Sequence, residues 1–268
     1  MTARRILMIG YGAIASEVVA GLRADGSGGV IAGVLLRPGS ASRKSVPAGV
    51  TVCETIAQAT AFEPDLVVEA AGHSAVQGTV PDLLTLGLPV LVSSIGALHD
   101  EALFSRLSAT ARTGGGRLLL ASGALGALDY VRACKTADPV TITYESRKPP
   151  SAWEAELRAL GHDPSTLTAP VVLFEGTARE AAAAYPQNLN VAAALALAGP
   201  GMDNVSVAVI CDPKVTGNTH VVKSQSPLGS MHIEIVNQPS PANPKTSMIV
   251  AQSVLSAIDQ YFSPVQML

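Results

Sequence analysis

Cysteine is scarce in this sequence: Cys53, Cys134 and Cys211 are the only three among 268 residues. They are far apart, form no CxxC pair and do not combine with histidine at metal-ligand spacing. An odd, scattered set of this kind argues against a disulfide framework and against a zinc site. We therefore expect no bound metal, and we interpret the cysteines as small core or strand residues.

Charged residues are also few. Asp, Glu, Lys and Arg make up 15% of the chain, and the formal net charge is −3. Binding to nucleic-acid phosphates needs clustered lysine and arginine, which this balance does not provide. We expect no nucleic-acid partner.

Long apolar runs are missing as well. No run reaches the ~20 residues that a helix needs to span a bilayer, and the N-terminus enters a strand pattern without the apolar core of a signal peptide. These features predict a cytoplasmic protein with no membrane partner.

Hydrophobic residues, in contrast, make up 48% of the sequence, which is typical of a well-buried α/β protein. A chain of 268 residues is long enough for one large domain or two modest ones. Two domains are favoured, because the pattern of strands and helices changes near residue 122.

The most informative segment is the beginning of the chain. An apolar run over residues 4–9, suited to a buried parallel strand, leads into Gly10-Tyr11-Gly12-Ala13-Ile14-Ala15 and then into a helical pattern. Gly10 permits a tight turn, and Gly12 lets the backbone approach a pyrophosphate that faces a helix N-terminus. Ala15 replaces the usual third glycine and is still small. The segment predicts dinucleotide binding at Gly10, Gly12, Ala13 and Ile14, with a plain tight turn as the alternative.

The first part of the chain alternates strands with helices, as a doubly wound parallel sheet requires. Further strands are predicted at 30–36, 50–53, 66–70, 89–93 and 117–121, and helices at 75–86 and 100–112. Asp100, followed by Glu101, suits the start of a helix. We therefore assign residues 1–121 to a dinucleotide-binding domain with a Rossmann-type sheet.

Beyond residue 122 the predicted strands are closely spaced, which favours an antiparallel or mixed sheet. They cover 140–146, 171–175, 205–211, 219–224 and 231–236. An alanine-rich stretch, 178–198, predicts a helix or a helix pair interrupted near Pro186. We assign residues 122–240 to an α+β domain that provides substrate binding, catalysis and dimerisation.

The C-terminal segment returns to helical periodicity over residues 243–261, after a proline-rich stretch. We expect residues 241–268 to pack back on the dinucleotide-binding domain. The sequence would equally permit this segment to close the second domain.

The choice between NAD and NADP depends on the end of the second strand. In an open parallel sheet, ligands lie beyond the carboxyl ends of the strands, and the second strand commonly ends in an acidic residue that binds the adenine ribose. Here Leu36 is followed by Arg37, with Arg43 and Lys44 nearby. This favours a 2′-phosphate and hence NADP, whereas a merely solvated Arg37 would be compatible with NAD.

Five histidines compete for a general acid–base role, because imidazole titrates near neutral pH. Structural or surface roles suit His99 beside a helix start, His162 in a turn and His232 in an alternating strand. His73 follows the fourth strand, where it can contact the cofactor, and His220 enters a strand from a polar loop. The pattern ranks His73 and His220 equally.

Two asparagines, Asn188 and Asn190, interrupt the alanine-rich run. An asparagine within a helix is costly unless it caps the helix, faces water or binds a ligand.

Cations are also needed if the substrate is anionic, and four candidates stay open: Arg147, Lys148, Lys214 and Lys223.

Several motifs, in this order, make the chain resemble the L-aspartate dehydrogenases over nearly its whole length. They are Gly10-Tyr11-Gly12-Ala13-Ile14, Val68-Glu69-Ala70-Ala71-Gly72-His73, Ser93-Ser94-Ile95-Gly96-Ala97, Ala121-Ser122-Gly123-Ala124-Leu125-Gly126-Ala127-Leu128-Asp129, Tyr185-Pro186-Gln187-Asn188-Leu189-Asn190-Val191-Ala192, and Asp212-Pro213 with Asn218-Thr219-His220. Enzymes of that family oxidise aspartate to iminosuccinate with NAD or NADP. The resemblance implies that His220 is the active-site residue and that Ala124 and Asn190 contact the dinucleotide. It also implies a homodimer, and a supply of iminosuccinate to NAD biosynthesis.

The implied chemistry agrees with the residues. The aspartate ammonium must lose a proton before hydride leaves Cα, and a neutral His220 can accept it and later activate water, which gives oxaloacetate and ammonia. Two other functions stay open: reduction of another small dicarboxylate, as in the dihydrodipicolinate reductases, and non-catalytic sensing of NAD(P)H. The motifs from Tyr185 to His220 favour aspartate over the first of these.

Overall fold

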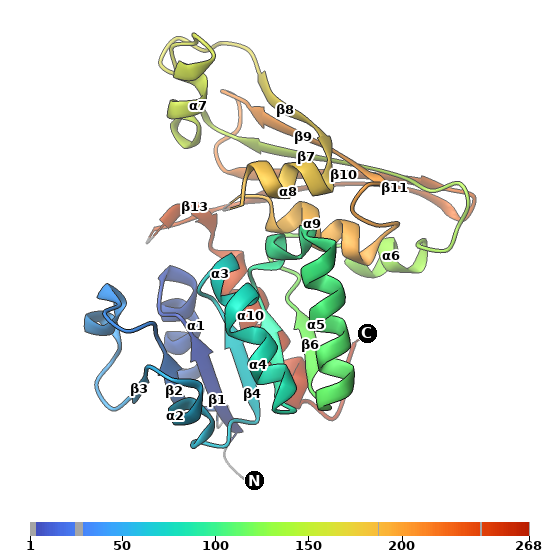
Figure 1. Cartoon of the computed structure of the whole chain (residues 1–268). Coiled ribbons are helices and arrows are strands. Elements are labelled where there is room, and N and C mark those ends of the chain that lie inside the picture. Colours follow the sequence, from blue (N-terminus) through green and yellow to red (C-terminus); the bar gives the residue numbers. More distant parts are fainter. Residues whose placement is uncertain (1–3, 25–28, 187, 242, 268) are drawn as a thin grey trace. The chain divides into compact units, whose positions relative to one another are not determined.

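The computed structural model describes residues 4–24, 29–186, 188–241 and 243–267. Gln187, which belongs to one of the family motifs, lies outside the described residues. The chain divides into two compact units: unit 1 comprises residues 1–121 and 251–267, and unit 2 comprises residues 122–250. Both units combine strands with helices (Figure 1).

Unit 1 is built on a six-stranded parallel sheet with the order β3-β2-β1-β4-β5-β6. The strands are β1 (Arg4–Ile9), β2 (Gly29–Leu35), β3 (Val52–Cys53), β4 (Leu66–Glu69), β5 (Pro89–Val92) and β6 (Arg117–Leu120). This is the strand order of the Rossmann fold, in which the chain reverses direction across the sheet between β1 and β4. The predicted doubly wound parallel sheet is confirmed.

The helices of unit 1 are mostly short. They are α1 (Ala13–Ala24), α2 (Ile56–Thr60), α3 (His73–Gly78), α4 (Val80–Thr85), α5 (Glu101–Gly114) and the C-terminal α10 (Ile249–Phe262), with 3-10 turns η1 (Ala41–Ser45) and η2 (Ile95–His99). The helical segment predicted over 75–86 is confirmed, but it is divided into α3 and α4, because Pro81 has no backbone N–H with which to continue α3. The predicted start of α5 is confirmed: the Asp100 side chain caps it and accepts a hydrogen bond from Leu103 N at 3.1 Å.

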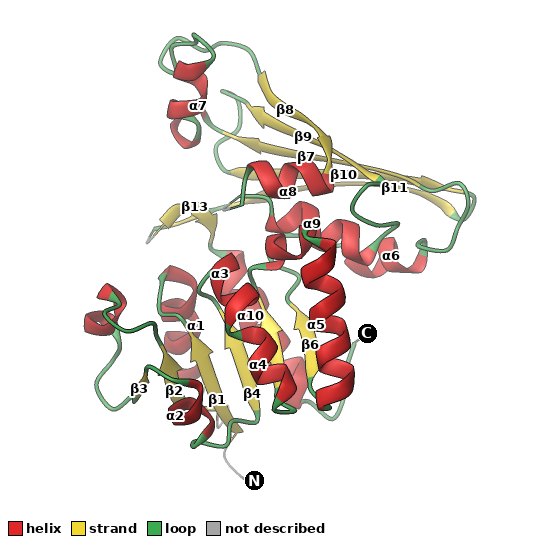
Figure 2. Cartoon of the chain, in the orientation of Figure 1, coloured by secondary structure: helices red, strands yellow, loops and turns green. Residues whose placement is uncertain are grey.

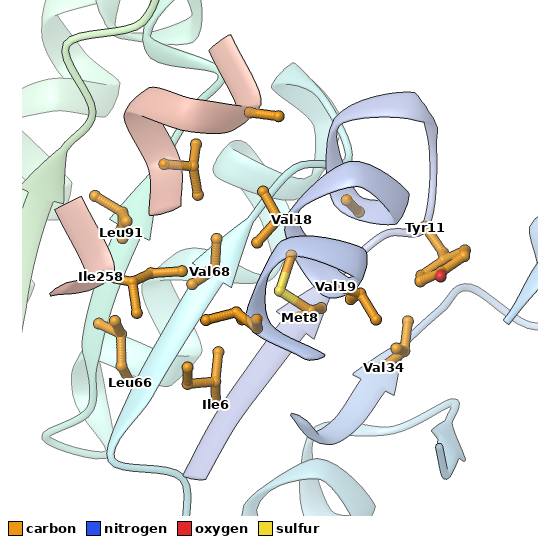
Figure 3. Close-up of a cluster of buried hydrophobic side chains, with 14 of the residues drawn as sticks. Ile6, Met8, Tyr11, Val18, Val19, Val34, Leu66, Val68, Leu91 and Ile258 are labelled. Atoms are coloured by element: carbon orange, nitrogen blue, oxygen red, sulfur yellow. The ribbon is translucent and has the colours of Figure 1, made fainter. Parts of the chain in front are cut away.

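The core of unit 1 covers both faces of its sheet. Ile6 and Met8 of β1 share a buried cluster with Val18 of α1 and Ile258 of α10 (Figure 3). Leu7 lies between them in β1, is equally buried and points to the opposite face. Both sides of the strand are therefore packed, as a parallel sheet requires.

Helix α10 packs closely beside α1. A Cβ added at Gly21 of α1 would lie 2.5 Å from Cδ1 of Leu255 in α10, so the glycine allows this approach. At the other end of α10, Arg4 of β1 stacks over Phe262, with 5.1 Å between the guanidinium carbon and the ring centroid. The C-terminal helix is thus part of the core of unit 1.

The returning segment begins later than predicted. Residues 243–247 form strand β13 (Asn243–Ser247), which pairs with β12 (Pro239–Ser240), and α10 starts only at Ile249. Cross-strand hydrogen bonds overrode the helical periodicity of residues 243–248, as tertiary context commonly does. The part of the chain that belongs to unit 1 starts at residue 251 instead of 241.

Unit 2 contains a five-stranded mixed sheet with the order β11-β10-β7-β9-β8 (Figure 2). The strands are β7 (Thr141–Lys148), β8 (Val171–Thr177), β9 (Val205–Cys211), β10 (Asn218–Ser226) and β11 (Gly229–Asn237). β7 and β9 are parallel, and the other neighbouring pairs are antiparallel. The predicted mixed sheet is confirmed.

The helices of unit 2 are α6 (Leu128–Ala133), α7 (Glu154–Ala159), α8 (Ala178–Ala184) and α9 (Asn190–Ala198), with the 3-10 turn η3 (Pro150–Ala152). The alanine-rich stretch is the predicted pair, α8 and α9, interrupted around Pro186. Within the described ranges, neither unit has a helix whose length and apolar character would suit a membrane crossing.

One face of the unit 2 sheet is covered by helices. Along β7, the side chains of Ile142, Tyr144, Ser146 and Lys148 are buried, whereas those between them are more exposed. A Cβ added at Gly199, at the end of α9, would lie 3.1 Å from Cδ1 of Ile142, which places α9 on the buried face. A tyrosine, a serine and a lysine on such a face need a specific explanation, because buried polar groups are costly without partners.

Candidate functional site

The turn after β1 is closely fitted to the loop after β4. Gly10 has a φ of +84°, and a Cβ at this position would lie 2.6 Å from Cβ and 2.8 Å from Cα of Ala71. Both the backbone conformation and the lack of space therefore require glycine. The turn brings the start of α1 to the carboxyl end of the parallel sheet.

The start of α1 has the features of an anion-binding site. A Cβ added at Gly12 would meet no atom within 4 Å, so the backbone borders open space there. Ser16 N donates to Gly12 O at 2.9 Å, and the amides of Ala13 and Ile14 precede this first intrahelical hydrogen bond. Such amides, together with the positive end of the helix dipole, suit a pyrophosphate.

A buried carboxyl group organises the neighbouring loops. Glu69, the last residue of β4, is fully buried. Its Oε1 accepts hydrogen bonds from Ala71 N at 2.7 Å, Gly72 N at 2.8 Å and Ser94 Oγ at 2.9 Å, and its Oε2 accepts one from Ser94 N at 3.0 Å. Glu69 thereby joins the carboxyl ends of β4 and β5. The sequence signal for this role is weak: an acidic residue ends an apolar run and is followed by small residues.

Two other predicted cofactor residues lie at the same edge of the sheet. His73 is the first residue of α3, directly after Gly72. Arg37 is exposed and follows the end of β2, whereas Arg43 forms an ion pair with Glu54 at 2.7 Å.

In unit 2, the antiparallel pairing of β7 with β10 builds a second polar group. His220 of β10 lies directly opposite Ser146 of β7. Tyr144 and Lys148, two residues to either side of Ser146, lie on the same face and diagonal to His220, within reach of long side chains. All four side chains are buried.

His220 is a neutral, buried imidazole. It is 3% exposed, its Nδ1 is hydrogen-bonded to Tyr144 Oη at 2.8 Å, and its ring stacks on that of Tyr144. Burial, together with the charge of Lys148, lowers the pKa of His220 to about 4. Nε2 has no hydrogen-bond partner among the residues that the structure describes. At neutral pH the ring therefore keeps one buried nitrogen that no described residue occupies.

Lys148 places a cation beside this imidazole. The side chain is buried, its Nζ donates to Asn188 Oδ1 at 2.7 Å, and it lies 5.5 Å from the ring centroid of Trp153. Asn188, one of the two asparagines singled out in the alanine-rich run, thus binds the ammonium group. A desolvated ammonium in a fixed position is suited to an anionic ligand.

Two other candidate cations lie on the opposite face of the sheet. Arg147 is bound there to Glu145 at 2.6 Å and to Asp212 at 2.8 Å. Lys223 lies opposite Thr143 in the β7–β10 register, three residues after His220 in β10, so its side chain points to the face opposite that of His220. A polar pocket on this face is lined by Glu145, Arg147, Asp212, Thr219, Lys223 and His232, among others. His220 does not line it.

The two residues that the family resemblance assigns to the dinucleotide lie in different elements of unit 2. Ala124 is buried, and its carbonyl oxygen accepts a hydrogen bond from Asn237 Nδ2 at 2.9 Å. Asn190 is the first residue of α9, two positions from Asn188.

Sequence patterns indicated His220, Asn188 and Asn190, but they did not predict the contact of Tyr144 with His220, because this contact arises from strand pairing.

The fold and these two groups of residues define a class of protein: a dehydrogenase with a Rossmann-type unit for a nicotinamide dinucleotide. A family profile described as the NAD-binding domain of homoserine dehydrogenase matches residues 10–121. A second profile, described as aspartate dehydrogenase, C-terminal, matches residues 129–261. The chain belongs to the L-aspartate dehydrogenase family.

Full-length relatives lead to the same family. The chain is 48% identical to L-aspartate dehydrogenase 2 of Bordetella pertussis, with 97% of each chain covered. It is 41% identical to L-aspartate dehydrogenase of Ruegeria pomeroyi, with 96% of this chain and 92% of the relative covered. The crystal structure of aspartate dehydrogenase from Thermotoga maritima is similar with a TM-score of 0.77 and 25% identity, covering 99% of both chains.

The first prediction concerns Glu69. In Glu69→Gln, an amide NH₂ replaces one acceptor oxygen and faces donors, so we expect the free energy of unfolding to fall by about 1–3 kcal/mol and dinucleotide affinity to weaken. Urea denaturation and fluorescence titration with the dinucleotide measure the two effects. The matched control is Glu63→Gln, in the same unit, where an exposed ion pair with Arg5 is lost. Equal effects of the two substitutions would contradict the role assigned to Glu69.

Proposed function

We propose that this protein catalyses the NAD(P)-dependent oxidation of L-aspartate to iminosuccinate, which water converts to oxaloacetate and ammonia, in a reversible reaction. The observation that carries the proposal is the neutral imidazole of His220, buried beside the ammonium group of Lys148. Membership of the L-aspartate dehydrogenase family supports the choice of substrate.

The residues for the cofactor are assigned as follows. The backbone at Gly10, Gly12, Ala13 and Ile14 holds the pyrophosphate, because the open space at Gly12 and the first amides of α1 fit an anion. Arg37 faces the adenine ribose, and His73, Ala124 and Asn190 make further contacts with the dinucleotide. When bound there, the dinucleotide would supply the acceptor for the hydride that leaves Cα of the substrate.

His220 is the general base. The α-ammonium group of aspartate must lose a proton so that the nitrogen lone pair can form the C=N bond as hydride leaves Cα. Nε2 accepts this proton, since Nδ1 is occupied by Tyr144. After the proton has passed to solvent, Nε2 takes a proton from the water that attacks the imine carbon and returns it to the departing ammonia.

Lys148 binds one carboxylate of the substrate. It is the candidate cation on the strands that shares the buried face with His220, and its contact with Asn188 fixes the position of Nζ. Holding a carboxylate there orients Cα and its ammonium group relative to the base, and such positioning lowers the barrier of the reaction.

Three broader expectations belong to the same proposal. The protein forms a homodimer, acts in the cytoplasm and supplies iminosuccinate to NAD biosynthesis. Each extends an expectation drawn from the sequence, and each can be tested separately from the chemistry.

The reaction itself is tested by following NADH and NADPH absorbance with aspartate, other amino acids, and oxaloacetate plus ammonia. We expect turnover with aspartate and, in reverse, with oxaloacetate plus ammonia. In His220→Ala, kcat should fall by about 10²–10⁴-fold, the usual contribution of a general base, with dinucleotide affinity nearly unchanged. His232→Ala, on the exposed face, is the control. Reduction of another dicarboxylate alone, no turnover of any substrate, or an active His220→Ala enzyme would refute the proposal.

A second test replaces Lys148 with an apolar residue of similar length. In Lys148→Met, KM for aspartate should rise by about 10- to 100-fold, because a hydrogen bond to a charged group contributes about 1.5–3 kcal/mol. Initial rates over a range of aspartate concentrations give this value. Lys223→Met, on the opposite face, serves as the control and should leave KM unchanged. A normal KM in Lys148→Met would remove Lys148 from the substrate site.

The cofactor assignment is tested at Arg37. If Arg37 binds a 2′-phosphate, Arg37→Ala should raise KM for NADP by about 10- to 100-fold, as expected for a lost hydrogen bond to a charged group, and should leave KM for NAD nearly unchanged. Lys44→Ala, an exposed neighbour, provides the comparison. An unchanged ratio of the two KM values in Arg37→Ala would show that Arg37 does not select the cofactor.

A further inference from the structure

Tyr144 has a contact with His220 that the proposed reaction does not by itself explain. The tyrosine is 1% exposed, its ring stacks on the imidazole with 6.0 Å between centroids, and its hydroxyl is 2.8 Å from Nδ1. Both residues come from the centre of the mixed sheet, where β7 and β10 pair side by side. The contact is therefore held by the backbone of two strands.

We propose that Tyr144 is a positioning residue that keeps the proton of His220 on Nδ1, so that Nε2 presents a free lone pair to the substrate ammonium. This inference rests on the proposed function of His220 as the base. It adds the group that sets the tautomer of that base.

The tautomer follows from the partners of the two ring nitrogens. A neutral imidazole has one N–H donor and one acceptor nitrogen. If Tyr144 donated to Nδ1, the proton would sit on Nε2, which is buried without an acceptor among the described residues. A buried N–H without an acceptor is rare in proteins because its desolvation is not compensated. The opposite arrangement, with Nδ1–H donating to Tyr144 Oη, avoids this cost.

The hydroxyl group of Ser146 lies close to this pair of residues. Ser146 is buried beside Tyr144 on the same face of β7, and it lies opposite His220. Ser146 Oγ forms no hydrogen bond among the described residues, so it is available as an acceptor when Tyr144 accepts from Nδ1–H. In this arrangement Nδ1 carries the proton of the imidazole, and Nε2 keeps a lone pair that no described residue occupies.

The charges around the pair fit an orienting role for Tyr144 and not a role as a base. Burial raises the pKa of Tyr144 far above its usual value, against a smaller opposite effect of the Ser146 hydroxyl, so the phenol stays neutral. Lys148 on β7 is the charged group that acts on His220, and it too favours the neutral ring. Tyr144 therefore directs the proton on His220 without exchanging its own.

The test reads the tautomer directly. Two-bond ¹H–¹⁵N spectra of protein labelled at histidine nitrogen show whether each ring nitrogen carries a proton, and comparison with His220→Gln identifies the signals of His220. For the wild-type protein at pH 7 we expect a protonated Nδ1 and an unprotonated Nε2. In Tyr144→Phe, which removes only the hydroxyl, we expect a shift of the proton toward Nε2.

Kinetics of the same variant provide the functional readout. In Tyr144→Phe, kcat for aspartate should fall by about 10- to 100-fold, the effect of losing one hydrogen bond to the base, with KM nearly unchanged. Tyr130→Phe removes a hydroxyl from α6 in the same unit and should change neither kcat nor the spectrum of His220.

The outcomes separate this inference from the proposed function. A protonated Nε2 in the wild-type protein, or an unchanged tautomer in a folded Tyr144→Phe protein, would overturn the role of Tyr144 whatever the substrate. If the wild-type protein showed the expected tautomer but no turnover of aspartate, the proposed function alone would be overturned. If Tyr144→Phe did not fold, the wild-type spectrum would still decide the tautomer.

Discussion

The antiparallel pairing of β7 with β10 is the constraint on which the chemistry of unit 2 depends. In the observed register, His220 lies opposite Ser146, and Tyr144 and Lys148 flank it diagonally on the buried face. Side chains alternate between the two faces of a strand, so a slip of one residue would move the imidazole to the face that carries Arg147. The register thus decides which cation, and which hydroxyl, lie beside the imidazole of His220.

In unit 1, a single buried carboxyl group sets the arrangement of the loops at the edge of the sheet. The parallel strands end at one edge of the sheet, and the loops that follow them carry backbone N–H groups that no longer pair with a neighbouring strand. These groups need other hydrogen-bond acceptors. Glu69 supplies acceptors for the loops after both β4 and β5. In unit 1 the buried carboxyl group is thus fully hydrogen-bonded to its neighbours. In unit 2 the buried imidazole of His220 is hydrogen-bonded at Nδ1, and its Nε2 has no partner among the described residues.

Much of this organisation was predictable from local sequence, and the exceptions have physical causes. Apolar runs indicated the strands of both sheets, and Gly10 indicated the turn that Ala71 now shows to be sterically required. Local periodicity failed at residues 243–247, where pairing with β12 prevailed. The roles of Glu69 and Tyr144 were not visible because each depends on a partner brought close only by the fold. The choice of Lys148 over Arg147 likewise needed the register.

The pairing of a buried ammonium with a neutral imidazole also suits a dicarboxylate substrate electrostatically. Lys148 contributes to the low pKa of His220, and a low pKa makes an imidazole a weak base. A substrate carboxylate bound at Lys148 offsets that positive charge, so that in the proposed reaction the proton affinity of His220 rises when aspartate arrives. In that proposal, the carboxylate that Lys148 binds both positions the substrate and strengthens the base. A small amine without a carboxylate would gain neither the positioning nor the stronger base.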